Sequence, residues 1–110
     1  MNRGAAAEAL AARFLAARGL AIVERNYRCR GGEIDLIVRE RDTLVFVEVR
    51  LRSGQAFGGA AESITSAKRR RLERAARHYL ARIGREPPCR FDAVLLDSLD
   101  SKRIEWLKGI

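Results

Sequence analysis

Two neighbouring segments with strand-like alternation constrain the fold of this chain more than any other feature. The segments are Gly32–Ile37 and Phe46–Arg50. In both, apolar and charged residues alternate among β-branched neighbours, a pattern typical of strands. A short charged segment, Glu40–Thr43, separates them. The pattern therefore predicts an antiparallel hairpin.

The register of this hairpin places two acidic side chains opposite each other. A hairpin centred in the middle of the charged turn pairs Asp35 with Glu48, and Glu33 with Arg50. Facing residues of an antiparallel pair have Cβ atoms about 4.5–5.5 Å apart. A slip of one residue would move the two acids to opposite faces of the hairpin. The pairing is thus a specific expectation that the structure can test.

Two opposed carboxylates on a mostly apolar hairpin repel each other and need compensation. A hard divalent cation with oxygen ligands would supply it. Alternatively, one acid is a solvated edge residue or pairs with a nearby arginine. The spacing alone leaves both interpretations open.

Length and composition predict a single soluble domain over residues 1–110. The chain has 110 residues, of which 47% are hydrophobic and 33% charged, as in ordinary globular proteins. No segment approaches the roughly 20 apolar residues of a membrane span, and the N-terminus lacks a secretory signal pattern. Cys29 and Cys89 are far apart and have no metal-ligating partner nearby. We expect a reduced cytoplasmic protein without a membrane partner.

The net charge of +8 and the pI of about 10.7 favour a polyanionic partner. The simplest such partner is nucleic acid. Most of the basic residues are arginine and alanine is abundant, a usage that a GC-rich genome also produces. The charge therefore supports nucleic-acid binding only modestly.

The hydrophobic pattern predicts an α/β fold with one mixed β-sheet flanked by helices, in the order α-β-β-β-α-β-β. Beside the hairpin, the expected segments are a helix over Ala5–Arg18 closed by Gly19, strands over Leu20–Arg28, Arg90–Asp97 and Arg103–Leu107, a Gly-rich loop over Ser53–Gly59, and a helix over Glu62–Ile83.

One lysine lies within the apolar face of the second predicted helix. Lys68 follows Ile64 by four residues and precedes Leu72 by four, so all three share a face. Its stem either packs while the ammonium reaches water, or the ammonium points toward the sheet. Three arginines on the opposite face favour a solvated surface over a dedicated groove: Arg70, Arg74 and Arg77.

The hairpin acids also match a known motif. Asp35, followed thirteen positions later by Glu48 and then by the basic Arg50, has the spacing of the PD-(D/E)xK nuclease superfamily. A wider set of residues together resembles the YraN-like family of small bacterial proteins over nearly the whole chain: Glu8, Arg25–Tyr27, Gly32–Ile37, Phe46–Arg52, Phe57–Gly58, Lys68 and Arg90–Asp92.

This resemblance implies a restriction-endonuclease-like fold, related to archaeal Holliday-junction resolvases and tRNA-endonuclease-like domains. It further implies a nuclease dependent on Mg²⁺ or Mn²⁺ that acts on structured or branched nucleic acid, with DNA preferred over RNA. A homodimer follows from the resolvase analogy alone, because junction resolution needs two active sites. The alternatives are a non-cleaving nucleic-acid-binding protein of the same fold and a basic interaction protein with a structural acid pair.

The resemblance also implies roles for individual residues. By motif position, Asp35 and Glu48 are the metal carboxylates, and the backbone carbonyl of Val49 is a further ligand. Glu8 matches a helix glutamate that reaches the metal directly or through water. Glu33 belongs to the family string without an assigned role.

The last motif position departs from the superfamily pattern, because Arg50 replaces a lysine. Arginine stays protonated at physiological pH, so it can hold a phosphate but cannot accept a proton from water. Either the metal alone activates the water, or Lys68 substitutes from the helix, or the chain binds without cutting. We expect Arg50, Arg52 and Lys68 to contact nucleic acid near the site.

Overall fold

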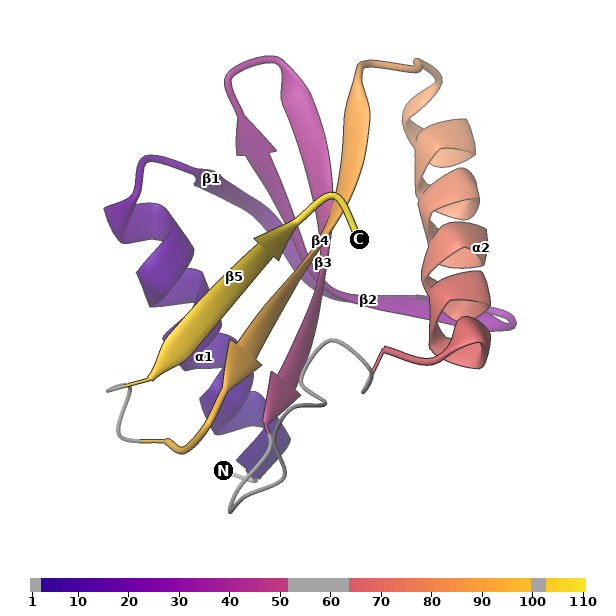
Figure 1. Cartoon of the computed structure of the whole chain (residues 1–110). Helices are drawn as coiled ribbons and strands as arrows, with labels where there is room; N and C mark the ends of the chain where they lie inside the picture. Colours follow the sequence, from indigo (N-terminus) through magenta and orange to yellow (C-terminus); the bar gives the residue numbers. More distant parts are fainter. Residues whose placement is uncertain (1–2, 52–63, 100–102) are drawn as a thin grey trace.

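The computed structural model describes residues 3–51, 64–99 and 103–110 (Figure 1). It confirms the α/β class and the predicted order of elements. The Gly-rich loop Ser53–Gly59 and Arg52 lie outside the described residues. Neither helix in the described ranges is long and apolar enough to cross a membrane. The elements are α1 (Arg3–Ala17), β1 (Ala21–Cys29), β2 (Gly32–Glu40), β3 (Thr43–Leu51), α2 (Ser66–Ile83), β4 (Cys89–Leu96) and β5 (Ile104–Lys108).

The five strands form one mixed sheet in the order β1-β2-β3-β4-β5. Each neighbouring pair is antiparallel except β3 and β4, which are parallel. Parallel neighbours need a crossover connection, and the segment containing α2 provides it. The crossover places α2 over one face of the sheet, while α1 covers the other.

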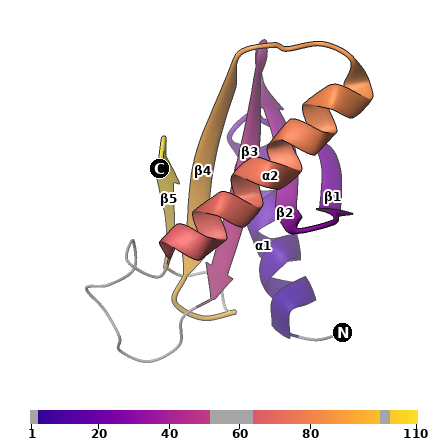
Figure 2. The ribbon, with the colours of Figure 1, turned by 90° about the vertical axis from the view of Figure 1, so that its right-hand side faces the viewer.

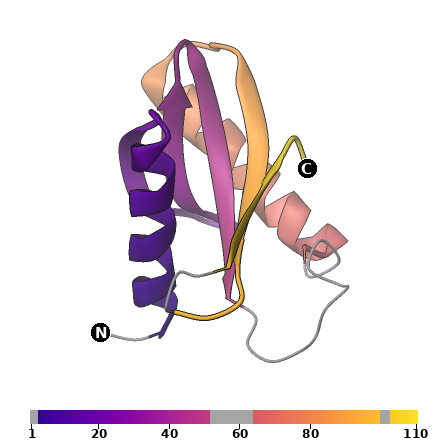
Figure 3. The same ribbon diagram turned by 60° about the vertical axis from the view of Figure 1, so that its left-hand side comes forward.

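Each helix buries its own apolar core against the sheet. On one side, Ala11 and Leu15 of α1 pack in a cluster with Leu36 and Val47. On the other side, α2 contributes a second cluster, with Leu72, Ala75, Ala76 and Tyr79 against Ile37 and Phe46 of the strands. Figure 2 shows α2 crossing in front of the sheet, and Figure 3 shows α1 along the opposite face.

The two helices end and begin at residues with identifiable caps. Gly19 follows α1 with φ 92°, the left-handed conformation that a helix C-cap requires, as predicted. The predicted start of the second helix at Glu62 was wrong, because α2 begins at Ser66. The hydroxyl of Thr65 accepts a hydrogen bond from the N–H of Lys68 at 3.2 Å and caps the helix. Ile64, expected on the same helix face as Lys68 and Leu72, is buried but lies before the start of the helix.

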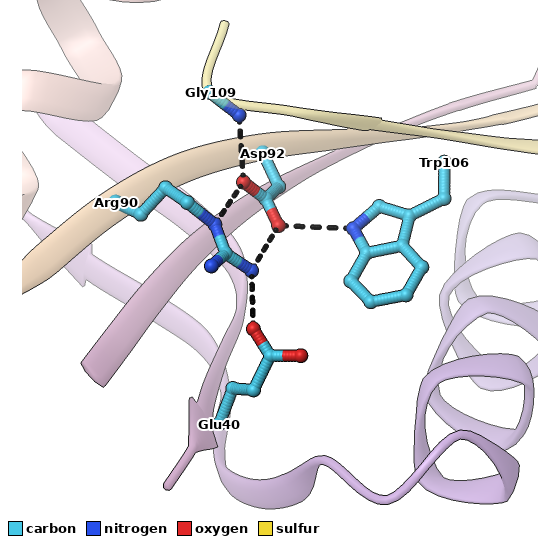
Figure 4. Close-up of polar contacts among 5 residues, drawn as sticks. All are labelled: Glu40, Arg90, Asp92, Trp106 and Gly109. Carbon is cyan, nitrogen blue, oxygen red and sulfur yellow. Dashed lines mark hydrogen bonds and ion pairs between the residues drawn. The ribbon is translucent and has the colours of Figure 1, made fainter. Parts of the chain in front are cut away.

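A buried carboxylate on β4 connects neighbouring parts of the sheet through hydrogen bonds (Figure 4). The side chain of Asp92 on β4 is fully buried. Its oxygens accept hydrogen bonds from Nε and Nη2 of Arg90 at 2.9 and 3.1 Å, Nε1 of Trp106 at 2.9 Å and the N–H of Gly109 at 3.0 Å. Arg90 Nη2 also lies 2.9 Å from Oε1 of Glu40. These donors satisfy the buried charge and join β4, β5 and the end of β2.

Replacing Asp92 with asparagine is expected to lower the free energy of unfolding by about 2–3 kcal/mol. The amide turns one acceptor into a donor, so Arg90 loses one of its two hydrogen bonds to this side chain, and either Trp106 or Gly109 loses its own. Denaturant unfolding measures the change. The matched control is Asp97→Asn, because Asp97 is half-exposed and its contact with Arg103 is 3.6 Å long; such a pair contributes about 1 kcal/mol or less. Equal losses in the two variants would contradict the structural role of Asp92.

Candidate metal and nucleic-acid site

The hairpin formed by β2 and β3 has the predicted register. Its ladder pairs Leu36 with Val47 at one end and Glu40 with Thr43 at the other. Arg41 and Asp42 form the turn, and Arg41 takes φ 57°. This two-residue connection fixes the register and therefore the faces on which the acids lie.

Asp35 and Glu48 lie just beyond the last pair of this ladder. Figure 1 shows β2 bending away from β3 in this region. Here the N–H of Val49 donates to Oδ2 of Asp35 at 2.8 Å. A hydrogen bond links Asp35 and Glu48. The two carboxyl groups thus meet at the fork where the strands separate.

Burial and mutual repulsion dominate the electrostatics of the pair. Burial, and then the charge of Glu48, raise the pKa of Asp35 from 3.8 to about 8, although its hydrogen bond from Val49 opposes the rise. Burial also raises the pKa of Glu48, while Arg50, Lys68 and a hydrogen bond with Asp35 oppose that shift. Both shifts favour a proton held by the pair when no cation is bound.

Two basic side chains border the carboxyl pair. Nη1 of Arg50 lies 3.9 Å from Oε2 of Glu48. Nε of Arg50 is buried and has no hydrogen-bond acceptor among the described residues. Lys68, half-buried in the first turn of α2, lies close enough for its charge to lower the pKa of Glu48. The structure thus brings both candidates for the lysine position to the same carboxylate.

The remaining acids named by the sequence occupy different places. The charge of Glu8, on α1, raises the pKa of Asp35, so Glu8 lies near the fork from the other helix. In the described part of the chain, no group of three or more Asp, Glu, His or Cys side chains is arranged to hold a metal ion. Contact between Glu8 and a metal through water therefore stays a prediction.

Glu33 does not join Arg50 in the ladder, which ends at Leu36 and Val47. Its Oε1 instead lies 3.3 Å from Nη2 of Arg71 on α2. Arg71 is not among the site residues that the motifs indicate. Its position three residues after Lys68 could have indicated it, because residues three apart are neighbours on a helix surface.

The backbone of Val49 fits the role that the motif assigns to it. A strand residue directs its N–H and C=O toward the same neighbouring strand. Because the N–H of Val49 bonds Asp35, its carbonyl also faces the fork. Two carboxylates and one carbonyl are all oxygen donors, and Mg²⁺ usually takes only one or two carboxylates and keeps several waters. The donor set therefore fits a hard divalent cation.

Comparisons with known proteins agree with the family resemblance. The profile described as "Uncharacterised protein family UPF0102" matches residues 7–96. A UPF0102 protein of Nitrosomonas europaea is 59% identical over 108 residues, which cover 98% of this chain and 92% of that protein. A UPF0102 protein of Cupriavidus taiwanensis is 62% identical over 107 residues, covering 96% of this chain and 79% of that protein. The chain belongs to the uncharacterised protein family UPF0102, the YraN-like family that its motifs resemble.

Proposed function

We propose that this protein is a metal-dependent nuclease that hydrolyses phosphodiester bonds in structured or branched nucleic acid, DNA in preference to RNA. The observation that carries the proposal is the half-buried carboxyl pair of Asp35 and Glu48, which meet beside Arg50 and Lys68. A purely structural role does not account for two acids that destabilise each other at the open end of a hairpin.

Each side chain of the site would have a distinct role in such a reaction. Asp35, Glu48 and the carbonyl of Val49 would hold Mg²⁺ or Mn²⁺ after losing the shared proton. When bound, the metal would supply an activated water and stabilise charge on the phosphoryl oxygens. Nε of Arg50, a buried donor without a described acceptor, is suited to a phosphate oxygen. Lys68 is suited to accept or deliver a proton, since lysine changes its pKa readily in buried sites.

The experiment that tests this proposal combines metal binding with cleavage. Calorimetric titration with Mg²⁺ and Mn²⁺ is expected to show binding to the wild type and little to Glu48→Gln. Gel assays on duplex, branched and single-stranded DNA and on structured RNA are expected to show cleavage that EDTA and Glu48→Gln abolish. A wild-type protein that binds neither cation and cuts none of these substrates contradicts the proposal.

A second function is favoured by one residue. Arg50 occupies the position of the usual lysine and cannot take a proton, so the chain is also suited to bind nucleic acid without cutting it. Binding of nucleic acid with no cleavage in either Mg²⁺ or Mn²⁺ is the result expected of this alternative. The resolvase analogy adds a homodimer to the main proposal, which sedimentation in the presence of a branched DNA would test.

A further inference from the structure

The arginines of α2 are distributed unevenly around the helix. At about 100° per residue, Arg71, Arg74, His78 and Arg82 form one stripe, and Arg70 and Arg77 lie beside it. Glu73 is the single acid in the sequence of α2; it lies away from that stripe, next to Arg70 and Arg77. The positive charge of the helix is therefore concentrated on one side.

That stripe faces the hairpin formed by β1 and β2. Arg71 contacts Glu33 of β2 at 3.3 Å, and Nδ1 of His78 lies 2.6 Å from the hydroxyl of Tyr27 on β1. Arg82 lies 3.9 Å from Glu24, also on β1. Figure 1 shows the ends of β1 and β2 running past α2, with their turn at the margin of the molecule.

The turn between β1 and β2 is held directly against the helix. A Cβ built on Gly31 would lie 2.7 Å from Nη1 of Arg74, so this side chain rests on the turn. A Cβ on Gly32 would lie 2.5 Å from the carbonyl oxygen of Arg71 and 2.9 Å from the backbone nitrogen of Ala75. Glycine at both positions lets the turn and the helix form one continuous surface, to which the exposed Arg30 adds a further charge.

We propose that this surface docks double-stranded DNA and presents it to the carboxyl pair. We name it the arginine ridge, and it comprises Arg30, Arg70, Arg71, Arg74 and Arg77. The inference rests on the proposed function in that it names the form of nucleic acid delivered to that site. It revises the interpretation of Arg70, Arg74 and Arg77 as a merely solvated face, because they continue a surface that begins at Arg71, whose partner Glu33 lies near the carboxyl pair.

The dimensions of the ridge suit a duplex. From Arg70 to Arg77 the helix advances about 10 Å at roughly 1.5 Å per residue, which equals about three base pairs at 3.4 Å each. The paired ends of β1 and β2 form a two-stranded ribbon, which the major groove of B-DNA, about 12 Å wide, admits. The deep, narrow major groove of A-form RNA does not admit such a ribbon.

The scarcity of exposed rings argues against single strands. Proteins that bind single-stranded nucleic acid stack its bases on aromatic side chains. Within the described ranges, Val23, at 39% exposure, is the one large hydrophobic side chain that is exposed, and no Phe, Tyr or Trp ring is. The exposed ring of His78 is held against the hydroxyl of Tyr27. The ridge therefore offers mainly contacts to phosphates.

The test measures binding in EDTA, where no cleavage interferes. Fluorescence anisotropy with a labelled DNA duplex of about two helical turns and with one of its strands compares the two forms. We expect the duplex to bind more tightly, and Arg70→Ala/Arg74→Ala to weaken duplex binding about 10–30-fold at physiological salt. The slope of log K against log salt concentration should become less steep by about 1.8, which corresponds to two lost phosphate contacts.

The matched control removes two exposed arginines on other elements. Arg13→Ala/Arg103→Ala changes the net charge equally, on α1 and beside β5, and should alter duplex affinity by less than threefold. Equal losses in the two double variants, or tighter binding of the single strand, would overturn the ridge. Because the assay contains no metal, intact duplex docking without nuclease activity would contradict only the proposed function. Conversely, if Arg70→Ala/Arg74→Ala binds the duplex as tightly as the wild type and still cleaves it when metal is added, only the proposed role of the ridge is contradicted.

Discussion

Asp35→Asn is expected to make the metal-free protein more stable at pH 8 and to abolish its stabilisation by Mg²⁺. In the wild type, burial and Glu48 disfavour the ionised form of Asp35. Asparagine has nearly the shape of the protonated acid and still offers an oxygen to the N–H of Val49. We expect a gain of about 2–4 kcal/mol, since each pKa unit corresponds to about 1.4 kcal/mol and relaxation of the site offsets part of the full shift.

The pH dependence of this gain follows from the direction of the shift. The pKa of Asp35 is raised from 3.8 to about 8 in the folded protein. Below pH 3.8 the side chain is protonated in both folded and unfolded chains, so wild type and variant should have similar stability. As pH rises, the unfolded chain ionises first and the wild type loses stability until about pH 8, beyond which the difference stays constant. Thermal melts in EDTA from pH 4 to 9 measure this difference.

Addition of Mg²⁺ should close most or all of the stability difference between the two proteins at pH 8. A cation that binds the ionised pair stabilises the wild type by about 2.7 kcal/mol at one hundred times its dissociation constant, whereas Asp35→Asn lacks one ligand. Asp97→Asn is the matched control, because Asp97 is half-exposed and lies outside the site. A functional carboxyl pair would be contradicted if Mg²⁺ did not change the melting temperature of the wild type. It would also be contradicted if Asp35→Asn were less stable than the wild type in EDTA.

The parts of this site that the sequence could predict are those set by local periodicity. The alternation on β2 and β3 and the short charged turn fix the register that pairs Leu36 with Val47. Once the register is fixed, Asp35 and Glu48 follow as the next pair beyond Leu36 and Val47. The place of Lys68 on the packed side of α2 follows from its spacing of four residues to the buried Leu72.

The parts that could not be predicted depend on where elements diverge or meet in space. Pairing by number alone places Glu33 opposite Arg50, but the ladder ends earlier and Glu33 contacts Arg71 of α2 instead. The separation of the strands also lets the N–H of Val49 bond a side chain. No spacing within either strand encodes these contacts, because they depend on the bend of β2 beneath a distant helix.

Asp92 shows the same limit in another part of the molecule. Its sequence neighbours place it in a strand, yet nothing local marks it as fully buried. Its partners Trp106 and Gly109 are brought to it by the antiparallel pairing of β5. The role of a buried acid is structural where donors satisfy it, as at Asp92. Asp35, with one described hydrogen-bond donor and three nearby acids, instead fits a functional role.

The second large effect is expected at Lys68. If its amine transfers a proton in the reaction, Lys68→Ala should lower kcat about 10²–10⁴-fold, the range typical of proton-transfer groups, with a smaller change in KM. Lys68 lies in the first turn of α2, and its charge lowers the pKa of Glu48, so its side chain lies near the carboxyl pair. Its backbone N–H bonds Thr65, and alanine preserves that cap, so the fold should persist.

Two further variants separate proton transfer from charge. Lys68→Arg keeps the positive charge but cannot release a proton, so it should be as inactive as Lys68→Ala if the amine transfers a proton. Restored activity in Lys68→Arg would mean that Lys68 acts by charge alone. Arg69→Ala is the matched control, since Arg69 is exposed on the same turn, and its turnover should stay within a few-fold of wild type.

Arg50→Lys completes the argument about which basic residue fills the motif position. The guanidinium lies 3.9 Å from Glu48 and keeps a buried Nε free of described acceptors. If Arg50 only holds a phosphate, lysine at that position should keep or raise metal-dependent cleavage. Lysine there should also partly rescue Lys68→Ala, because it places a second titratable amine beside the same carboxylate. A Lys68→Ala protein with wild-type turnover would eliminate the substitute lysine and leave the metal as the activator of water.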